Sequence, residues 1–394
     1  MRHRTVGLLS LGHLVTDINQ GALPALLPFL IVEYGLSYAA AGFLIFACNI
    51  ASTLVQPIFG HLADRRPNTW LLPAGIVSAG AGLAMTGFAP SYAWTCAAVM
   101  VSGVGVAAFH PQGARLVNHV AGERKATAMS VFGVGGTFGF AIGPGLVTAA
   151  LLHWGLRGTA VLALPTTLLA AFLIWHLAAA PIAASGSASS RRGKSPAEAR
   201  DSWGPFARLT AAVVARAVLF FGFNTFVPLY WIHVLGQSKA AGATALTVFA
   251  LAGVVGNLLG GQLADRYGAT RVAMAGFATL LPLAPALIAV TNVPAALVVL
   301  GLIGFALSTT YSPLVILGQA YLPNHMGLSA GVTLGIAISI GGVATPLLGR
   351  IADQYGLWAT LAVLGAVPLV SAILSLTLPE PQRLRLQPSG PTST

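Results

Sequence analysis

Charged side chains are scarce in this sequence. Of its 394 residues, 20 are Lys or Arg and nine are Asp or Glu, so charged residues make up only 7% of the chain. Soluble domains carry roughly 25% charged residues, and this set is too small to cover a surface that faces water. Hydrophobic residues make up 56%, and the mean hydropathy is +0.81. The composition excludes a soluble globular protein and predicts a helical membrane protein with many spans.

Cysteines and the common catalytic motifs are also few or missing. The two cysteines, Cys48 and Cys96, lie inside apolar runs without the spacing of metal ligands, and we interpret them as packing residues. The sequence contains no HExxH, no GxSxG and no nucleotide-binding P-loop. It therefore predicts a protein that is not an enzyme, binds no metal or cofactor and does not use ATP directly. The net charge of +11 does not predict nucleic-acid binding, because the cations are scattered over short loops.

Apolar runs of about 20 residues, each long enough to cross a bilayer of roughly 30 Å, recur along the chain. We predict twelve spans, near residues 6–32, 38–63, 70–90, 92–115, 126–152, 157–180, 207–235, 240–264, 271–291, 294–320, 327–350 and 356–379. A charged stretch rich in Ser, Ala and Gly separates the sixth from the seventh. These limits predict an N-terminal six-helix bundle (1–180), a cytoplasmic linker (181–206), a C-terminal six-helix bundle (207–380) and a cytoplasmic tail (381–394).

The distribution of cations predicts the orientation. Placing both termini in the cytoplasm puts fifteen of the 20 Lys and Arg residues on that side. Only Arg157, Lys239 and Arg350 fall on the opposite side, while Arg115 and Arg216 lie within spans or at a span end. Cytoplasmic loops of membrane proteins carry an excess of Lys and Arg. We therefore predict that both termini and the linker are cytoplasmic.

The two halves of the sequence resemble each other. GHLADRR (60–66) matches GQLADRY (261–267) at an offset of 201, and the same offset places Gln56 opposite Asn257. Gly143-Pro144 has the counterpart Thr345-Pro346 at an offset of 202. Chance similarity between Ala-, Gly- and Leu-rich helices is the alternative, but several matches share one register. An internal duplication of this kind is typical of a two-bundle transporter with its site between the halves.

The repeated Gly-x-x-x-Asp-Arg motif predicts a gate at the cytoplasmic end of two spans. Its glycines allow close helix contact, and its carboxylates can be neutralised by an arginine or a helix N-terminus. Arg115 is a candidate partner for Asp64, although simple topology signals explain these charges equally well. The six residues of the two motifs are Gly60, Asp64, Arg65, Gly261, Asp265 and Arg266.

Gly135, Gly139 and Gly143 recur every four residues in the fifth span, and Pro144 follows them. The glycines form one face, which predicts close and slidable contact with another helix, and the proline predicts a bend. Ordinary helix packing is the simpler alternative. We assign these four residues to the gating apparatus.

Several motifs resemble those of one transporter family. The paired Gly-x-x-x-Asp-Arg loops and the glycine strip resemble signatures of the major facilitator superfamily, in which the strip is associated with antiporters. HLVTD (13–17) with Gln20, QPIFGHLADR (56–65) and FHPQGAR (109–115) resemble the fosmidomycin-resistance exporters of that superfamily. The resemblance implies an all-α membrane protein with twelve transmembrane helices in two pseudo-symmetric six-helix bundles.

Two departures restrict what the resemblance implies. The first loop reads DRRPNTW (64–70) and lacks the family's closing Gly-Arg-Arg. Phe109 precedes Gln112-Gly113 where the superfamily often has an arginine. Proton coupling therefore cannot be assigned to that arginine in this chain.

Asp17 is the one acid placed deep in a predicted span, since the other eight belong to loops, span ends or tails. A charged Asp near the centre of a membrane helix costs about 2.5–3.5 kcal/mol on insertion scales, so it should face a cavity or a partner. His13, Asp17 and Gln20 share one helix face because they lie at positions i, i+4 and i+7. We predict that Asp17 and His13 carry the coupling proton; the alternative is a static hydrogen bond between helices.

Further polar residues inside spans are candidates for substrate binding, although many such groups only join helices. Arg216 would suit an anionic substrate, or its side chain could extend to the membrane interface. His110 could bind substrate or relay a proton, or it could fill the kink at Pro111. The full set of candidates is Gln20, Asn49, Gln56, His110, Gln112, Arg216, Asn224 and Asn257.

Together these features predict a secondary active transporter that works by alternating access. The expected function is proton-coupled antiport that exports small drugs or organic anions similar to fosmidomycin; the alternative is proton-coupled uptake of a small organic solute. A channel is disfavoured by the duplicated halves and the buried acid. We expect a monomer in the bacterial inner membrane whose partners are the lipid bilayer, a small-molecule substrate and protons.

Overall fold

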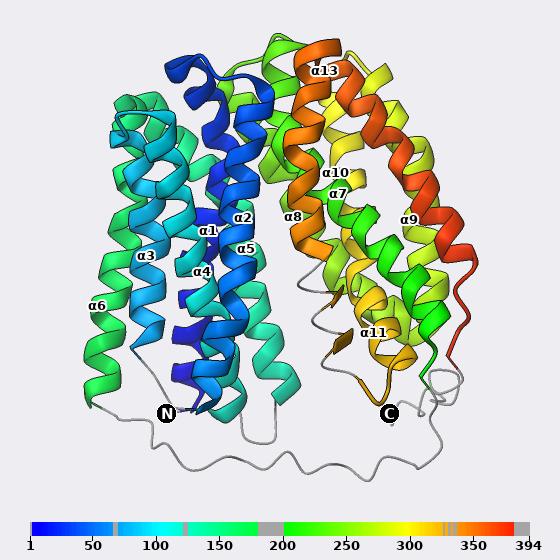
Figure 1. Cartoon of the computed structure of the whole chain (residues 1–394), viewed down its shortest axis with the longest axis horizontal. Coiled ribbons are helices and arrows are strands. Elements are labelled where there is room, and N and C mark those ends of the chain that lie inside the picture. The colour runs from blue at the N-terminus through cyan, green and yellow to red at the C-terminus, as the bar shows by residue number, and fades with distance from the viewer. Residues whose placement is uncertain are drawn as a thin grey trace. The chain divides into compact units, whose positions relative to one another are not determined.

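The computed structural model describes residues 2–65, 70–120, 125–179, 201–325, 328–329, 332–333 and 337–381. Within these ranges every regular element is a helix (Figure 1). The first part of the chain holds α1 (Arg2–Tyr34), α2 (Tyr38–Arg65), α3 (Leu71–Met85), η1 (Thr86–Phe88), α4 (Tyr92–Val120), α5 (Lys125–Trp154), η2 (Gly155–Leu162) and α6 (Ala163–Ala179). The second holds α7 (Trp203–His233), α8 (Lys239–Tyr267), α9 (Ala269–Ala289), α10 (Val293–Thr309), α11 (Tyr311–Tyr321) and α13 (Ala337–Leu376).

Ten helical stretches of the described residues are long and apolar enough to cross a membrane. Helices suit this environment because they satisfy every backbone N–H and C=O group without water. Two of the ten, Ala128–His176 with 49 residues and Ile340–Leu376 with 37, each cover parts of two predicted spans. The predicted span 327–350 lies partly outside the described residues, so the all-helical membrane fold is confirmed and the count of twelve stays a prediction.

Glycines with positive φ mark four breaks between spans. Gly35 (φ 60°) follows α1 and Gly236 (φ 63°) follows α7, whereas Gly155 (φ 62°) follows α5 and Gly356 (φ 84°) divides α13. Glycine adopts this conformation at little cost because it has no Cβ. Each pair is related by the offset of 201 found in the sequence. The repeat therefore extends to the backbone conformation at the turns.

The chain divides into two compact units. The first contains Met1–Ala184, Asn224–Ala250 and Thr345–Thr360, and the second contains Ser185–Phe223, Leu251–Ala344 and Leu361–Thr394. This grouping follows spatial proximity, so parts of α7, α8 and α13 join the first unit. The predicted division into two bundles with a linker and a tail follows sequence order and stays a prediction. Residues 181–200 of that linker and 382–394 of that tail lie outside the described part.

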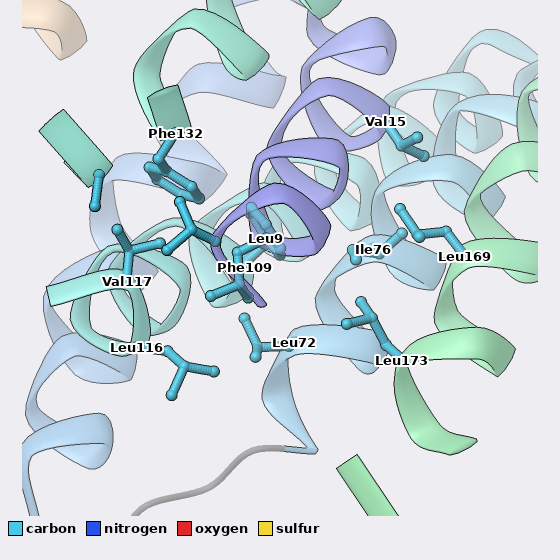
Figure 2. Packing of buried hydrophobic residues seen from close by; sticks show 12 residues of the cluster. Leu9, Val15, Leu72, Ile76, Phe109, Leu116, Val117, Phe132, Leu169 and Leu173 are labelled. Carbon is cyan, nitrogen blue, oxygen red and sulfur yellow. The ribbon is translucent and has the colours of Figure 1, made fainter. Parts of the chain in front are cut away.

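An apolar cluster joins α1, α3, α4, α5 and α6 in the first unit. Phe109 of α4 lies at its centre with no exposed surface, among Leu9, Leu72 and Phe132 (Figure 2). Its other members are Val6, Val15, Ile76, Leu116, Val117, Ala128, Leu169 and Leu173. Phe109 is the residue found where the resembling family often has an arginine. In this structure Phe109 completes the apolar cluster, and its ring centroid lies 6.1 Å from that of His13.

The glycine strip of α5 packs directly on α1. A Cβ at Gly135, Gly139 or Gly143 would collide with the backbone carbonyl oxygen of Ser10, Leu14 or Ile18. Association of membrane helices depends on such close backbone packing, because lipid tails are as apolar as leucine. Pro144 lies inside α5, which continues to Trp154. The strip therefore makes the close contact expected of it, and the helix does not end at the proline.

Replacing Gly139 with Ala should separate α1 from α5, because the added methyl group has no space beside the Leu14 carbonyl. Overpacking of this kind costs about 1–3 kcal/mol, so the melting temperature of the purified protein should fall. Gly133→Ala is the matched control on the same helix, since nothing lies within 4 Å of a Cβ there. Equal melting temperatures for the two variants would contradict the packing described here.

Candidate functional site

Asp17 lies in α1 and is buried, with 8% of the residue exposed. His13, one turn earlier on α1, places its Nε2 atom 3.3 Å from Oδ2 of Asp17. His110 of α4 places its Nε2 atom 2.9 Å from Oδ1. The carboxylate is thus held between two imidazoles, one on each oxygen, and we call these three residues the His–Asp–His cluster.

A hydrogen bond to the backbone determines the position of one proton in this cluster. Nδ1 of His13 lies 2.8 Å from the carbonyl oxygen of Phe132, and because a carbonyl only accepts, Nδ1 carries the hydrogen. In a neutral imidazole the other nitrogen is then an acceptor, so Nε2 would direct a lone pair at the Asp17 carboxylate. This contact is favourable only when a proton lies between the two groups. With Nδ1 donating to Phe132, the His13–Asp17 contact is therefore suited to a shared proton, which either residue can carry.

Aromatic rings and α5 enclose the cluster. The His13 ring stacks on Phe132 with 4.2 Å between centroids and meets His110 edge-on at 4.9 Å. A Cβ at Gly136 of α5 would lie 2.7 Å from Oδ2 of Asp17 and would collide with Nε2 of His13. Only a glycine lets α5 cover the edge where His13 meets Asp17. Phe132 and α5 thus cover part of the cluster, while its two imidazoles stay half-buried.

Among the described residues, these three side chains are also a group with the composition of a metal site. Their ligand atoms all lie within 4.8 Å of one another. Both oxygens of Asp17, however, are already at hydrogen-bonding distance from an imidazole nitrogen. We interpret the cluster as a set of groups that share protons.

The structure brings His110, assigned by its sequence to substrate binding, to the carboxylate of Asp17. The other candidates of the first unit are more dispersed. Asn49 donates to the Ile45 carbonyl of its own helix (3.0 Å). Gln20 is half-buried, Gln56 is exposed, and Asn224 is buried. The buried Gln112 has no hydrogen-bond partner for Oε1 among the described residues.

Arg216 of α7 lies half-buried in the second unit. Its Nε donates to the Leu307 carbonyl (3.2 Å) and to Oγ1 of Thr310 (3.1 Å), at the end of α10. Its guanidinium also lies over the Tyr311 ring, 5.0 Å from the centroid. The ion pairs found in the described part of the chain involve only Asp17 and Asp201 with histidines. Arg216 is thus a cation inside a span, with no carboxylate of the described residues bound to it.

Asn257 of α8 lies close to the same segment. Its Oδ1 accepts a hydrogen bond from Oγ of Ser312 at 3.0 Å. Ser312 follows Tyr311 directly, so the start of α11 contacts both Arg216 and Asn257. Two of the predicted substrate residues therefore contact the start of α11, Arg216 through Tyr311 and Asn257 through Ser312.

The predicted gate is only partly described. Gly60, Asp64 and Arg65 lie in α2, but their side chains are outside the described residues, as is any pairing of Asp64 with Arg115. Arg115 itself is half-buried in α4. In the second motif Asp265 and Arg266 are exposed, and Gly261 faces Ser312. The gating role of these residues remains a prediction.

Sequence reasoning missed three residues at these sites. Gly136 stands next to the glycine strip, so its position one residue beyond Gly135 was a usable signal. Phe132 acts through its backbone carbonyl, and Tyr311 through its ring face. Neither contact leaves a pattern in the sequence.

Comparison with known proteins agrees with this architecture. Residues 9–333 match the model of the Major Facilitator Superfamily. The chain is 30% identical to the uncharacterized MFS-type transporter YfnC of Bacillus subtilis (strain 168), over 96% of this chain and 93% of that protein. It is 28% identical to the Fosmidomycin resistance protein of Escherichia coli (strain K12), over 95% of this chain and 92% of that protein.

Solved structures support the fold alone. A bacterial homolog of the human lysosomal transporter Spinster, inward-facing and occupied, superposes with a TM-score of 0.79 at 16% identity, covering 95% of this chain and 96% of its own. A mutant of the nucleoside transporter NupG gives a TM-score of 0.75 at 15% identity, covering 95% and 99%. With the family match over most of its length, the chain belongs to the Major Facilitator Superfamily and is a multi-pass membrane transporter, not an enzyme.

Proposed function

We propose that this protein is a proton-coupled antiporter that exports small organic anions, including drugs such as fosmidomycin, by alternating access. The observation that carries the proposal is the His–Asp–His cluster. Its carboxylate is buried, its two imidazoles are half-buried between apolar helices, and His13 and Asp17 are placed to share a proton that either residue can carry. Ionisable groups at such positions in membrane proteins mark proton or ion pathways.

The cluster can load and release a proton through small changes. Asp17 attracts His110 most strongly while its carboxylate is ionised, so transfer of the shared proton from His13 to Asp17 weakens the contact to His110. Because these residues lie on α1 and α4, the protonation state alters the attraction between two helices. In export, a proton from the outside binds to the cluster, favours release of the cargo and leaves to the cytoplasm after the bundles rock.

The substrate class follows from Arg216. A guanidinium presents a planar set of donors that matches carboxylate and phosphonate oxygens. Arg216 contacts only neutral groups among the described residues, so an anionic cargo would supply its missing counter-charge. The name of the relative from Escherichia coli, the Fosmidomycin resistance protein, supports the same class. We assign Asn257 and Ser312 to the same substrate site.

We place the protein in the bacterial inner membrane with both termini in the cytoplasm. The orientation rests on the excess of Lys and Arg in the loops on that side. The bacterial sources of the relatives support the location.

Transport into inverted membrane vesicles tests the proposal. Under the proposed orientation the vesicle lumen corresponds to the outside, so an acidic lumen should drive fosmidomycin into it above the bath concentration. Nigericin, which collapses the pH gradient, should abolish the accumulation, and vesicles without the protein should show none. Accumulation only in right-side-out vesicles with an acidic exterior would replace antiport with proton-coupled uptake. No gradient-driven transport of fosmidomycin or other organic anions in either kind of vesicle would contradict the proposal.

A further inference from the structure

A third copy of the Gly-x-x-x-Asp pattern lies in α13. GRIADQYG (349–356) repeats the Gly, Asp, Tyr and Gly of GQLADRYG (261–268) at the same spacing. The closing glycines of both copies have positive φ, 93° at Gly268 and 84° at Gly356. The two copies thus have the same backbone conformation at their closing glycine as well as the same sequence pattern. Asp353 corresponds to Asp265, which is exposed and makes no ion pair within the described residues.

Asp353 binds the N-terminus of α2. The backbone N–H of Tyr38 donates to Oδ1 of Asp353 (2.7 Å), and that of Ala39 donates to Oδ2 (3.0 Å). The next N–H, that of Ala40, donates to Oγ of Ser37 at 3.1 Å. The first N–H groups of a helix have no partner within the helix, and they carry partial positive charge. Asp353 therefore neutralises a helix end that Ser37 caps only in part.

The helices touch along the turn that follows. A Cβ at Gly349 would lie 2.5 Å from the Tyr38 carbonyl oxygen, and a Cβ at Gly42 would lie 2.6 Å from that of Thr345. Oγ1 of Thr345, a fully buried residue, donates to the Gly42 carbonyl at 2.8 Å. Each helix thus contributes one glycine, and the contact is close on both sides. All these residues belong to the first compact unit.

We propose that Asp353, Gly349 and Thr345 form a releasable latch with the start of α2, which holds one end of the transporter closed during part of its cycle. This inference rests on the proposed alternating access, because α2 and α13 belong to different halves of the repeat. The carboxylate bonds are exposed, so water can replace both partners when the contact opens. A polar contact of this kind can hold the seam between α2 and α13 closed and still open at a low cost in free energy, unlike a purely apolar contact.

Within the part of the chain that the structure describes, the repeat has no second copy of this latch. The offset of 201 relates Ser37 to Ser238, and Oγ of Ser238 accepts from the N–H of Ala241 at the start of α8, again at 3.1 Å. The same offset places Leu152 opposite Asp353. The two helix starts therefore share the serine cap, and α2 is the one of the two that receives a carboxylate from the described residues. The latch therefore stabilises the contact at the start of α2 and not the similar one at the start of α8.

The test measures how often the seam opens. The native cysteines are replaced (Cys48→Ala, Cys96→Ala), and a reporter is introduced as Thr345→Cys, whose side chain is buried in the closed seam. The purified protein in lipid nanodiscs is treated with a maleimide fluorophore. Asp353→Asn should raise the labelling rate about 5-fold, because an anion at a helix N-terminus favours the closed form by roughly that factor. Gly349→Ala should also raise it, because its methyl group meets the Tyr38 carbonyl.

Glu33→Gln is the matched control, since Glu33 is an exposed acid that makes no ion pair within the described residues. Its labelling rate should equal that of the reporter protein. The latch is wrong if Asp353→Asn and Gly349→Ala both label at the rate of the control. Labelling needs neither substrate nor a proton gradient, so a failed transport assay would leave this result unaffected.

Discussion

Replacing Asp17 with Asn will abolish uphill transport while downhill exchange of substrate continues. The amide keeps the size of the carboxylate, but it neither releases nor takes up a proton, so the cycle loses its coupling. A gradient of one pH unit supports up to about tenfold accumulation per coupled proton. In the variant the substrate should reach only equal concentrations on both sides. Gradient-driven accumulation and substrate exchange are measured in the same vesicles.

His119→Gln is the control for the Asp17 variant, because His119 is an exposed histidine of α4 outside the His–Asp–His cluster. It should transport like the parent protein at equal expression. His110→Gln should lie between the two, since it removes one of the two imidazoles on Asp17. Uphill transport by Asp17→Asn with the proton dependence of the parent would make Asp17 a structural residue and end the proposed mechanism.

Replacing Arg216 with Gln will weaken the transport of anions much more than that of neutral analogues. A hydrogen bond to a charged group contributes about 1.5–3 kcal/mol, and each 1.4 kcal/mol changes affinity about tenfold. The KM for an anionic substrate should therefore rise by about 10- to 150-fold. An uncharged ester of the same compound should show little change, because it has no charge to pair with the guanidinium.

Arg216→Lys and Arg157→Gln complete the Arg216 experiment. Lysine keeps the charge without the planar donors, so its KM for the anion should fall between those of the parent and Arg216→Gln. Arg157 is exposed, follows α5 and should be replaceable without effect. Equal changes for the anion and its ester would assign Arg216 to helix packing through Thr310 and Tyr311 instead of substrate binding.

Local patterns in the sequence were sufficient to predict much of this protein. The spans and their order follow from apolar runs, because a bilayer leaves the backbone little choice but the helix. The proximity of His13 to Asp17 follows from the 3.6-residue period of one helix. The contact of Gly135, Gly139 and Gly143 with another helix follows from their spacing. These inferences required no knowledge of which helices are neighbours.

The contacts that the sequence did not predict join residues that lie far apart along the chain. His110 and Asp17, whose side chains meet, are 93 positions apart in the sequence, and Tyr38, whose backbone N–H donates to Asp353, is 315 positions from it. Each pair forms only because separate helices pack in one particular way, and no period within a span encodes that. Phe109 illustrates the same point, since the apolar cluster around it is built from residues of five helices. The contacts between residues of different helices were therefore the part that could not be predicted from the sequence.

The pairing of His13 with Asp17 has a consequence for how the protein enters the membrane. Both residues belong to α1, the first span to be synthesised, whereas His110 and Phe132 arrive with later helices. Residues at i and i+4 meet as soon as the helix forms, so the acid has a partner before any other span exists. A hydrogen bond between the imidazole and the carboxyl group lowers the cost of an isolated Asp in a bilayer. Asp17, which we assign to energy coupling, thus has a partner within its own helix when α1 enters the lipid during biogenesis.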